Sequence, residues 1–117
     1  MKSVEDKIDK KSDYFINFPT DPITEFFLYP THLGHFFYQP GYRQHRGHFD
    51  SFLLMYILEG SLFVEFNSKK WKVDKNYFVL IDCYQEHSYY SDIGWESIWI
   101  HFDGFSARKM YEMSVNK

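Results

Sequence analysis

The residues that could do chemistry are most concentrated between positions 95 and 104 of the sequence. Most residues of Glu96–Phe102 are β-branched or aromatic, which predicts a strand that ends at the following glycine. Side chains alternate along a strand, so Ser97, Trp99 and His101 share one face. A hydroxyl, an indole and an imidazole on one face suit the wall of a polar-ligand pocket. They equally fit a buried strand whose Trp and His are ordinary core residues.

The opposite face of the same predicted strand carries only apolar side chains. Ile98, Ile100 and Phe102 alternate with the polar set. We therefore expect these three residues to pack on one side of a β-structure, away from any ligand.

The histidines raise the question of a metal site. Metal-holding β-barrels of this size usually offer a His-x-His pair, a Glu a few residues later, and a further His. Here His45 and His48 are separated by two residues rather than one, which on an extended segment points them to opposite faces. Leu53 and Leu54 stand near the place of the Glu, and only His87 occupies a ligand-like position. Since a transition-metal site needs about three convergent ligands, we predict no metal.

Catalytic motifs find little support in this sequence. No serine lies on a glycine-flanked elbow, and the six glycines are scattered singly at turns rather than forming a phosphate-binding loop. Cys83 stands between Asp82 and Tyr84, where the nearby acid disfavours a thiolate. We expect no enzymatic activity and no cofactor.

A binding site for a small polar molecule is the better hypothesis. Aromatic faces can stack on sugars or cations, and Arg, Tyr, Ser and His supply fixed hydrogen bonds. The candidate ligand-binding residues are Arg43, Arg46, His87, Tyr89, Ser97, Trp99 and His101.

Composition limits the class of protein. The 117 residues suffice for one domain, and an aromatic share of 22% favours β-structure. A net charge of −3 gives no global attraction to nucleic acid. The single Cys83 excludes an internal disulfide and fits a reducing compartment. No apolar run is long enough to span a membrane, and the charged N-terminus is no secretory signal, so we expect a cytoplasmic protein.

The order of the predicted elements indicates a mainly β fold. Residues 1–24 are charged or proline-broken and predict a mobile arm. Short strand patterns separated by turns then run from residue 25 to 104, including Glu25–Tyr29 and a turn at Glu59-Gly60, which predicts an antiparallel sandwich or barrel. A helix is expected over residues 105–117, with an apolar stripe formed by Ala107, Met110, Tyr111 and Val115.

Several stretches together resemble the N-terminal effector-binding and dimerisation domain of AraC-type transcriptional regulators. The resemblance covers roughly residues 25–104 and rests on their order and spacing, in segments Arg46–Leu54, Tyr56–Gly60, Phe78–Cys83 with His87 and Tyr89, and Trp95–Gly104. It implies a cupin-like β-barrel of the jelly-roll type (a double-stranded β-helix), followed by a helix that starts a dimer interface.

The resemblance also implies a function. The family binds sugars or other small metabolites in the barrel, usually without metal, and Tyr89 and Trp99 match its pocket residues. Ser97 departs from the family, because the sugar-binding members have a histidine there. The helix-turn-helix domain that binds DNA is not in this sequence, so we expect a homodimeric sensor domain with a small-molecule effector. The alternative is a stand-alone metal-dependent cupin enzyme, an isomerase or a dioxygenase.

Overall fold

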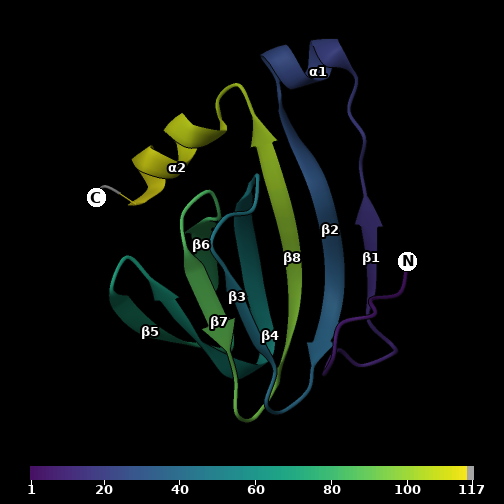
Figure 1. The fold of residues 1–117 in the computed structure, drawn as a ribbon, viewed down its shortest axis with the longest axis vertical. Coiled ribbons are helices and arrows are strands. Elements are labelled where there is room, and N and C mark those ends of the chain that lie inside the picture. Colours follow the sequence, from purple (N-terminus) through teal and green to yellow (C-terminus); the bar gives the residue numbers. More distant parts are fainter. Residues whose placement is uncertain (116–117) are drawn as a thin grey trace.

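Strand β4 (Phe52–Phe66) organises the fold because it belongs to both sheets of the barrel. The computed structural model describes residues 1–115. One sheet contains β1 (Asp13–Ile16), β2 (Leu28–Tyr38), β8 (Trp95–Gly104), the first half of β4, and β6 (Phe78–Asp82). The other contains β5 (Lys69–Asp74), the second half of β4, β7 (His87–Tyr90) and β3 (Arg43–Arg46). All pairs are antiparallel, and the two sheets curl around one interior (Figure 1). The predicted antiparallel β-barrel with a C-terminal helix is confirmed.

Strand β4 continues through Glu59-Gly60, where the sequence predicted a turn. The register of β4 against β8 shifts between Ile57 and Glu59, which marks a bulge that bends the strand without ending it. Gly60 has φ +77°, and a Cβ there would lie 2.3 Å from the carbonyl oxygen of Gly94. Only glycine fits this bend, which lets one strand pass from one sheet to the other.

The first strand predicted for the barrel is also different in the structure. Instead of a strand over Glu25–Tyr29 that stops at Pro30, there is a short helix α1 (Asp21–Phe26), and β2 then runs through the proline. The register of β2 against β8 shifts between Pro30 and His32. A proline is tolerated there because an irregular position needs no ladder N–H.

The segment predicted as a mobile arm over residues 1–24 contains regular structure and packs on the barrel. Strand β1 pairs with β2, and the preceding loop donates the backbone N–H of Asp9 to Phe37 O at 2.9 Å. Ile8 packs against the apolar core. Tyr14 of β1 also packs against this core, so apolar side chains between the charged residues make the contacts of this segment.

The outer face of β8 corrects a second expectation. Ser97, Trp99 and His101 are buried and point inward, but Ile98 is 52% exposed, and Ile100 and Phe102 are only half-buried. Phe102 packs on Phe52 with ring centroids 5.7 Å apart. The apolar face therefore lies on the outside of the barrel, and only its Phe102 end is covered.

Helix α2 (Ala107–Val115) supplies that cover. Ala107 is fully buried, and the Tyr111 ring lies 5.3 Å from that of Phe52. Arg108 donates to the buried carboxylate of Asp82 at 2.7 and 3.3 Å, which ties the helix to the end of β6. Ala107 is thus unavailable to a partner, whereas Met110 and Val115 stay exposed. The predicted helix extended to residue 117, and its last two residues lie outside the described range.

Neither of the helices within residues 1–115 is long and apolar enough to cross a membrane.

Candidate functional site

A cavity of about 300 Å³ lies inside the barrel, between the inner faces of the two sheets and the N-terminal segment. Aromatic and basic side chains dominate its wall. The lining residues are Ser3, Val4, Glu5, Tyr14, His32, Phe36, Tyr38, Tyr42, Arg46, Phe49, Leu53, Met55, Tyr89, Trp99 and His101. Of the predicted ligand-binding residues, Arg46, Tyr89, Trp99 and His101 are therefore brought together here, and their binding role stays a prediction.

Trp99 is closely packed in the cavity wall. Its neighbour across the β2–β8 ladder is Gly34, and a Cβ on that glycine would lie 2.5 Å from Cζ2 of the indole. The Phe36 ring meets the indole edge-on at 5.0 Å. Trp99 is 8% exposed, yet its indole N–H has no hydrogen-bond partner. A buried donor without a partner costs free energy, which a ligand acceptor could recover.

The two predicted arginines have opposite positions, although both lie on β3. Arg46 points inward, with its guanidinium 4.4 Å above the ring of Phe49, and its Nη1 is buried without a hydrogen-bond partner. Arg43 points outward, lies above the Tyr90 ring and pairs with Asp92 at 3.8 Å. The sequence left the choice open, and the structure assigns only Arg46 to the cavity.

Two histidines close one end of the cavity. Nδ1 of His101 lies 2.8 Å from the Ser51 hydroxyl, and the His32 ring meets the His101 ring edge-on at 5.8 Å. Burial lowers the pKa of His101 to about 3, and the charge of Arg46 acts in the same direction. Burial likewise lowers the pKa of His32. Both imidazoles are thus neutral at pH 7 and offer hydrogen bonds rather than charge.

Two further predicted residues face the interior without lining the cavity. Ser97 is fully buried, and the His87 side chain is 1% exposed. Because Nδ1 of His87 lies 2.9 Å from the carbonyl oxygen of Gln85, it must donate, and Nε2 is left as a buried acceptor without a partner. Burial lowers the pKa of His87.

Sequence reasoning missed the side of the cavity that the N-terminal segment closes. Glu5 Oε1 accepts hydrogen bonds from the Tyr42 hydroxyl and from Nε2 of Gln44, both at 3.0 Å. Tyr38 stacks on Trp95 at 3.7 Å and forms an aromatic layer with Tyr42. The alternation of His32, Gly34, Phe36 and Tyr38 along β2 was the available signal, since all four face inward.

Cys83 is a structural residue. It is fully buried, and burial raises the pKa of its thiol to about 12, with the nearby Asp82 acting in the same direction and Arg46 against it. A thiol with this pKa is no nucleophile at neutral pH.

The donor set does not fit a transition metal. His45 lies outside the barrel, with Nδ1 2.6 Å from the Ser88 hydroxyl, and His48 pairs with Asp50 on the surface. Leu53, near the position where the Glu ligand was expected, lines the cavity. Within residues 1–115, no three His, Cys, Asp or Glu side chains converge on one point as metal ligands would.

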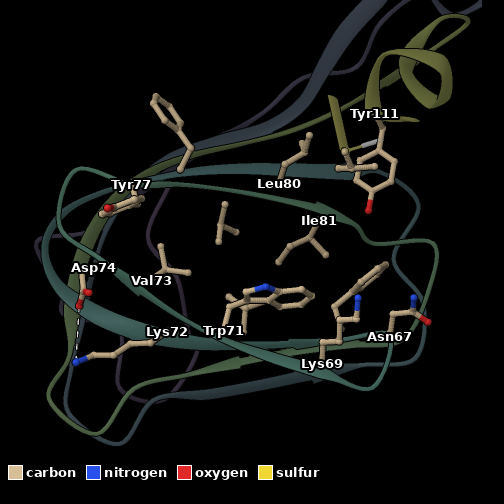
Figure 2. Close-up of a pocket in the computed structure, with 15 residues that line it drawn as sticks. Asn67, Lys69, Trp71, Lys72, Val73, Asp74, Tyr77, Leu80, Ile81 and Tyr111 are labelled. Atoms are coloured by element: carbon tan, nitrogen blue, oxygen red, sulfur yellow. Dashed lines mark ion pairs between the residues drawn. The ribbon is translucent and has the colours of Figure 1, made fainter. Parts of the chain in front are cut away.

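A second and larger hollow opens between the two sheets, where β5 and β6 form their edges, and the buried core residues Val73 and Ile81 belong to its lining. This groove, of about 780 Å³, runs between β5 and β6, and Tyr111 of α2 lies at one end of it (Figure 2). Val115 of the same helix also lines it. The Trp71 side chain points into this groove on the same side of β5 as Val73 (Figure 2). Trp71 and Tyr77 are nevertheless 47% and 66% exposed, and the exposed Lys72 and Asp74 pair across 3.8 Å. Of the buried polar atoms without a partner in residues 1–115, none belongs to a residue that lines the groove.

Solved structures with the same fold cover most of the chain. The plu4264 protein from Photorhabdus luminescens aligns with 100% of this chain and 92% of its own, at 13% identity and a TM-score of 0.64. KdgF from Halomonas sp. aligns over 86% of this chain and 82% of its own, at 14% identity and 0.62. A cupin superfamily protein from Desulfitobacterium hafniense covers the same shares at 13% and 0.58. At these identities the likeness shows the cupin fold alone.

The sequence itself gives the family. Among curated proteins none matches the chain. A family model described as the AraC-like ligand binding domain matches residues 29–112, which is most of the chain and includes every strand that lines the cavity except β1 and the start of β2. The chain therefore belongs to the AraC-like ligand-binding domain family.

Proposed function

We propose that this domain binds a small polar metabolite, such as a sugar, in the cavity of the barrel and acts as the sensor of a transcription regulator. The observation that carries the proposal is the pair of unpartnered donors in the cavity wall, Nε1 of Trp99 and Nη1 of Arg46. Buried polar groups in proteins are nearly always hydrogen-bonded, so two orphans at one cavity call for a ligand that accepts from both.

The dimensions and the chemistry of the cavity support a small, hydroxylated ligand. A volume of about 300 Å³ lies at the lower end of the range for small-molecule sites, which suits a molecule of one ring. The hydroxyls of Tyr38, Tyr42 and Tyr89 belong to lining residues, and the Trp99 indole offers a face for C–H groups.

The N-terminal segment gives the sensor a second state. Glu5 reaches Tyr42 and Gln44 from outside the barrel, and its own carboxylate is exposed. A ligand that takes the Tyr42 hydroxyl would compete with Glu5 and shift the segment between two positions.

We propose further that the regulator is a homodimer and that a separate helix-turn-helix domain binds DNA. Helix α2 keeps Met110 and Val115 exposed, while Tyr111 is half-buried on the barrel. Dimerisation would therefore use a narrower stripe than the sequence predicted. We do not propose an enzymatic role, because a metal-dependent enzyme would need further ligands beside His87 and His101. The neighbouring strand β4 presents Leu53 and Met55 to the interior instead.

Screening of the purified protein against neutral sugars and small polar metabolites tests the proposal, with the thermal midpoint and tryptophan fluorescence as readouts. Binding by at least one compound, lost on mutation of a cavity residue, supports it. Metal analysis of the same preparation tests the alternative. Near-stoichiometric zinc, iron or manganese held by His87 would contradict the sensor proposal and favour a cupin enzyme.

A further inference from the structure

We infer that the ligand is a small monocarboxylate whose carboxylate is received by Arg46. This inference rests on the proposed function, since it names the chemical class that the same cavity takes. It depends on the charges inside the barrel rather than on the shape of the cavity.

Arg46 is the cation of the cavity, and it lacks a counter-charge. Within residues 1–115, the other arginines have carboxylate partners: Arg43 pairs with Asp92 at 3.8 Å and Arg108 with Asp82 at 2.7 Å. For Arg46 no carboxylate oxygen of the described chain lies within 4.0 Å, and its Nη1 is buried without any hydrogen bond. Its guanidinium is held instead on the face of Phe49.

The groups around Arg46 leave it as a single positive charge. His87 is its neighbour across the β3–β7 ladder, and His32 and His101 line the same end of the cavity. All three imidazoles are disfavoured as cations by burial and by the guanidinium itself. Glu5 is the one carboxylate among the lining residues, and its oxygen is engaged by Tyr42 and Gln44.

A single half-buried guanidinium with a buried, unpartnered Nη1 calls for one anionic group on the ligand. A guanidinium presents parallel N–H donors that fit the two oxygens of a carboxylate, and a charge without a partner in a low-dielectric interior is costly. A phosphate would bring nearly two negative charges to one arginine and to neutral histidines, so the site favours a carboxylate. The orphan N–H of Trp99 then adds a neutral donor for another oxygen of the same ligand.

The binding test uses neutral compounds and acids of matched shape. Glucose and glucuronate, galactose and galacturonate, and benzyl alcohol and benzoate are titrated against the protein by tryptophan fluorescence, up to about 10 mM. We expect at least one acid to bind about tenfold or more tightly than its neutral partner. Arg46→Gln should weaken that acid by at least about 30-fold. Arg43→Gln, on the same strand but outside the barrel, should change the affinity by less than about twofold.

The outcomes separate this inference from the proposed function. The carboxylate inference is wrong if a neutral compound binds as tightly as its acid, or if the Arg46→Gln variant keeps its affinity for the acid. The proposed sensor function would stand in either case. The inference is also wrong if none of the acids binds. If none of the neutral compounds binds either, the result counts against the proposed sensor function as well.

A second measurement needs no ligand. Since Arg46 is half-buried and its Nη1 is buried without a partner, Arg46→Met should raise the thermal midpoint by about 4 °C, whereas Arg43→Met should leave it unchanged. A fall of similar size, or loss of folding, would show that Arg46 serves the structure rather than an anion and would overturn the inference.

Discussion

The cavity around Trp99 and the groove between β5 and β6 differ in their polar groups more than in their volumes. The groove is larger, about 780 Å³ against about 300 Å³, and its lining is rich in aromatic and aliphatic side chains. Yet its polar groups are satisfied or exposed to solvent, as Lys72 and Asp74 are by each other. The cavity is smaller, but it holds an arginine and an indole that lack hydrogen-bond partners.

The difference indicates which hollow is built for a ligand. An apolar groove that is filled only by water costs the protein little stability, because exposed hydrophobic side chains are common on protein surfaces. A buried donor without a partner costs about 1–3 kcal/mol, and two such donors line the cavity whereas none lines the groove. This difference supports the proposal that the ligand binds in the cavity.

Two tryptophans offer the strongest test of this comparison. Trp99→Ala in the cavity should cost about 3–5 kcal/mol of unfolding free energy, because it removes an indole that is 8% exposed, and it should abolish effector binding. Trp71→Ala in the groove removes a side chain that is 47% exposed and should cost about 0.5 kcal/mol. Urea denaturation and fluorescence titration measure both effects.

Trp99→Phe keeps an aromatic ring without the N–H and separates packing from binding. If this variant folds and binds the effector as tightly as the parent, the indole donor has no role. If Trp71→Ala abolishes binding instead, the groove is the ligand site and the comparison fails.

Two glycines test how closely the cavity wall is packed. Gly34→Ala would place a methyl group 2.5 Å from the indole of Trp99, so the ring must shift toward the cavity. We expect a loss of about 1–3 kcal/mol in stability and weaker effector binding. Gly47→Ala is the matched control, since a Cβ there meets no atom within 4 Å. Equal effects of the two substitutions, measured by denaturation, would show that the ring is not held by Gly34.

The part of the fold that could be predicted from the sequence is the part that depends on the two-residue alternation of side chains along strands. Alternation along β8 gave the inward set Ser97, Trp99 and His101 correctly, because one buried face fixes the register of a strand. Bends were harder to predict. Glu59-Gly60 has the composition of a turn, and only the close approach of Gly94 shows that the strand continues.

The candidate site was predictable in part, for a related reason. Arg46 and Arg43 lie on one short strand, and which of them faces inward depends on the ladder between β3 and β7, which a polar stretch does not reveal. Glu5 and Tyr42 meet through contacts distant in sequence, so no local pattern could place them together. For the same reason the sequence does not reveal that β1 pairs with β2.

The histidines of the cavity should make the stability of the protein depend on pH. His101 has a folded pKa of about 3, below the value of about 6.5 in an unfolded chain, so the unfolded state gains a proton first as the pH falls. Its contribution to stability is complete above pH 6.5 and is lost progressively below it, by up to about 1.4 kcal/mol per pH unit. His101→Gln should reduce the slope of stability between about pH 6.5 and 4.5.

Denaturation at several pH values measures this slope, which does not depend on the absolute cost of the substitution. His45→Gln is the control, because that side chain lies on the surface of the barrel. An unchanged slope in His101→Gln would mean that the imidazole is accessible to protons in the folded state, and the cavity would then be open to water.

The smallest expected effect on stability concerns the exposed side of α2, where the groove ends. Met110 is 46% exposed, so Met110→Glu should change the unfolding free energy by no more than about 0.5 kcal/mol. If α2 pairs with a second copy, the buried charge would nevertheless weaken self-association strongly, since an apolar interface does not pair it. Sedimentation at several protein concentrations shows the difference. Lys109→Glu introduces the same side chain on a neighbouring face of the helix and should leave association unchanged. A parent protein that is monomeric at every concentration, or two variants that behave alike, would restrict α2 to covering Phe52 on its own barrel.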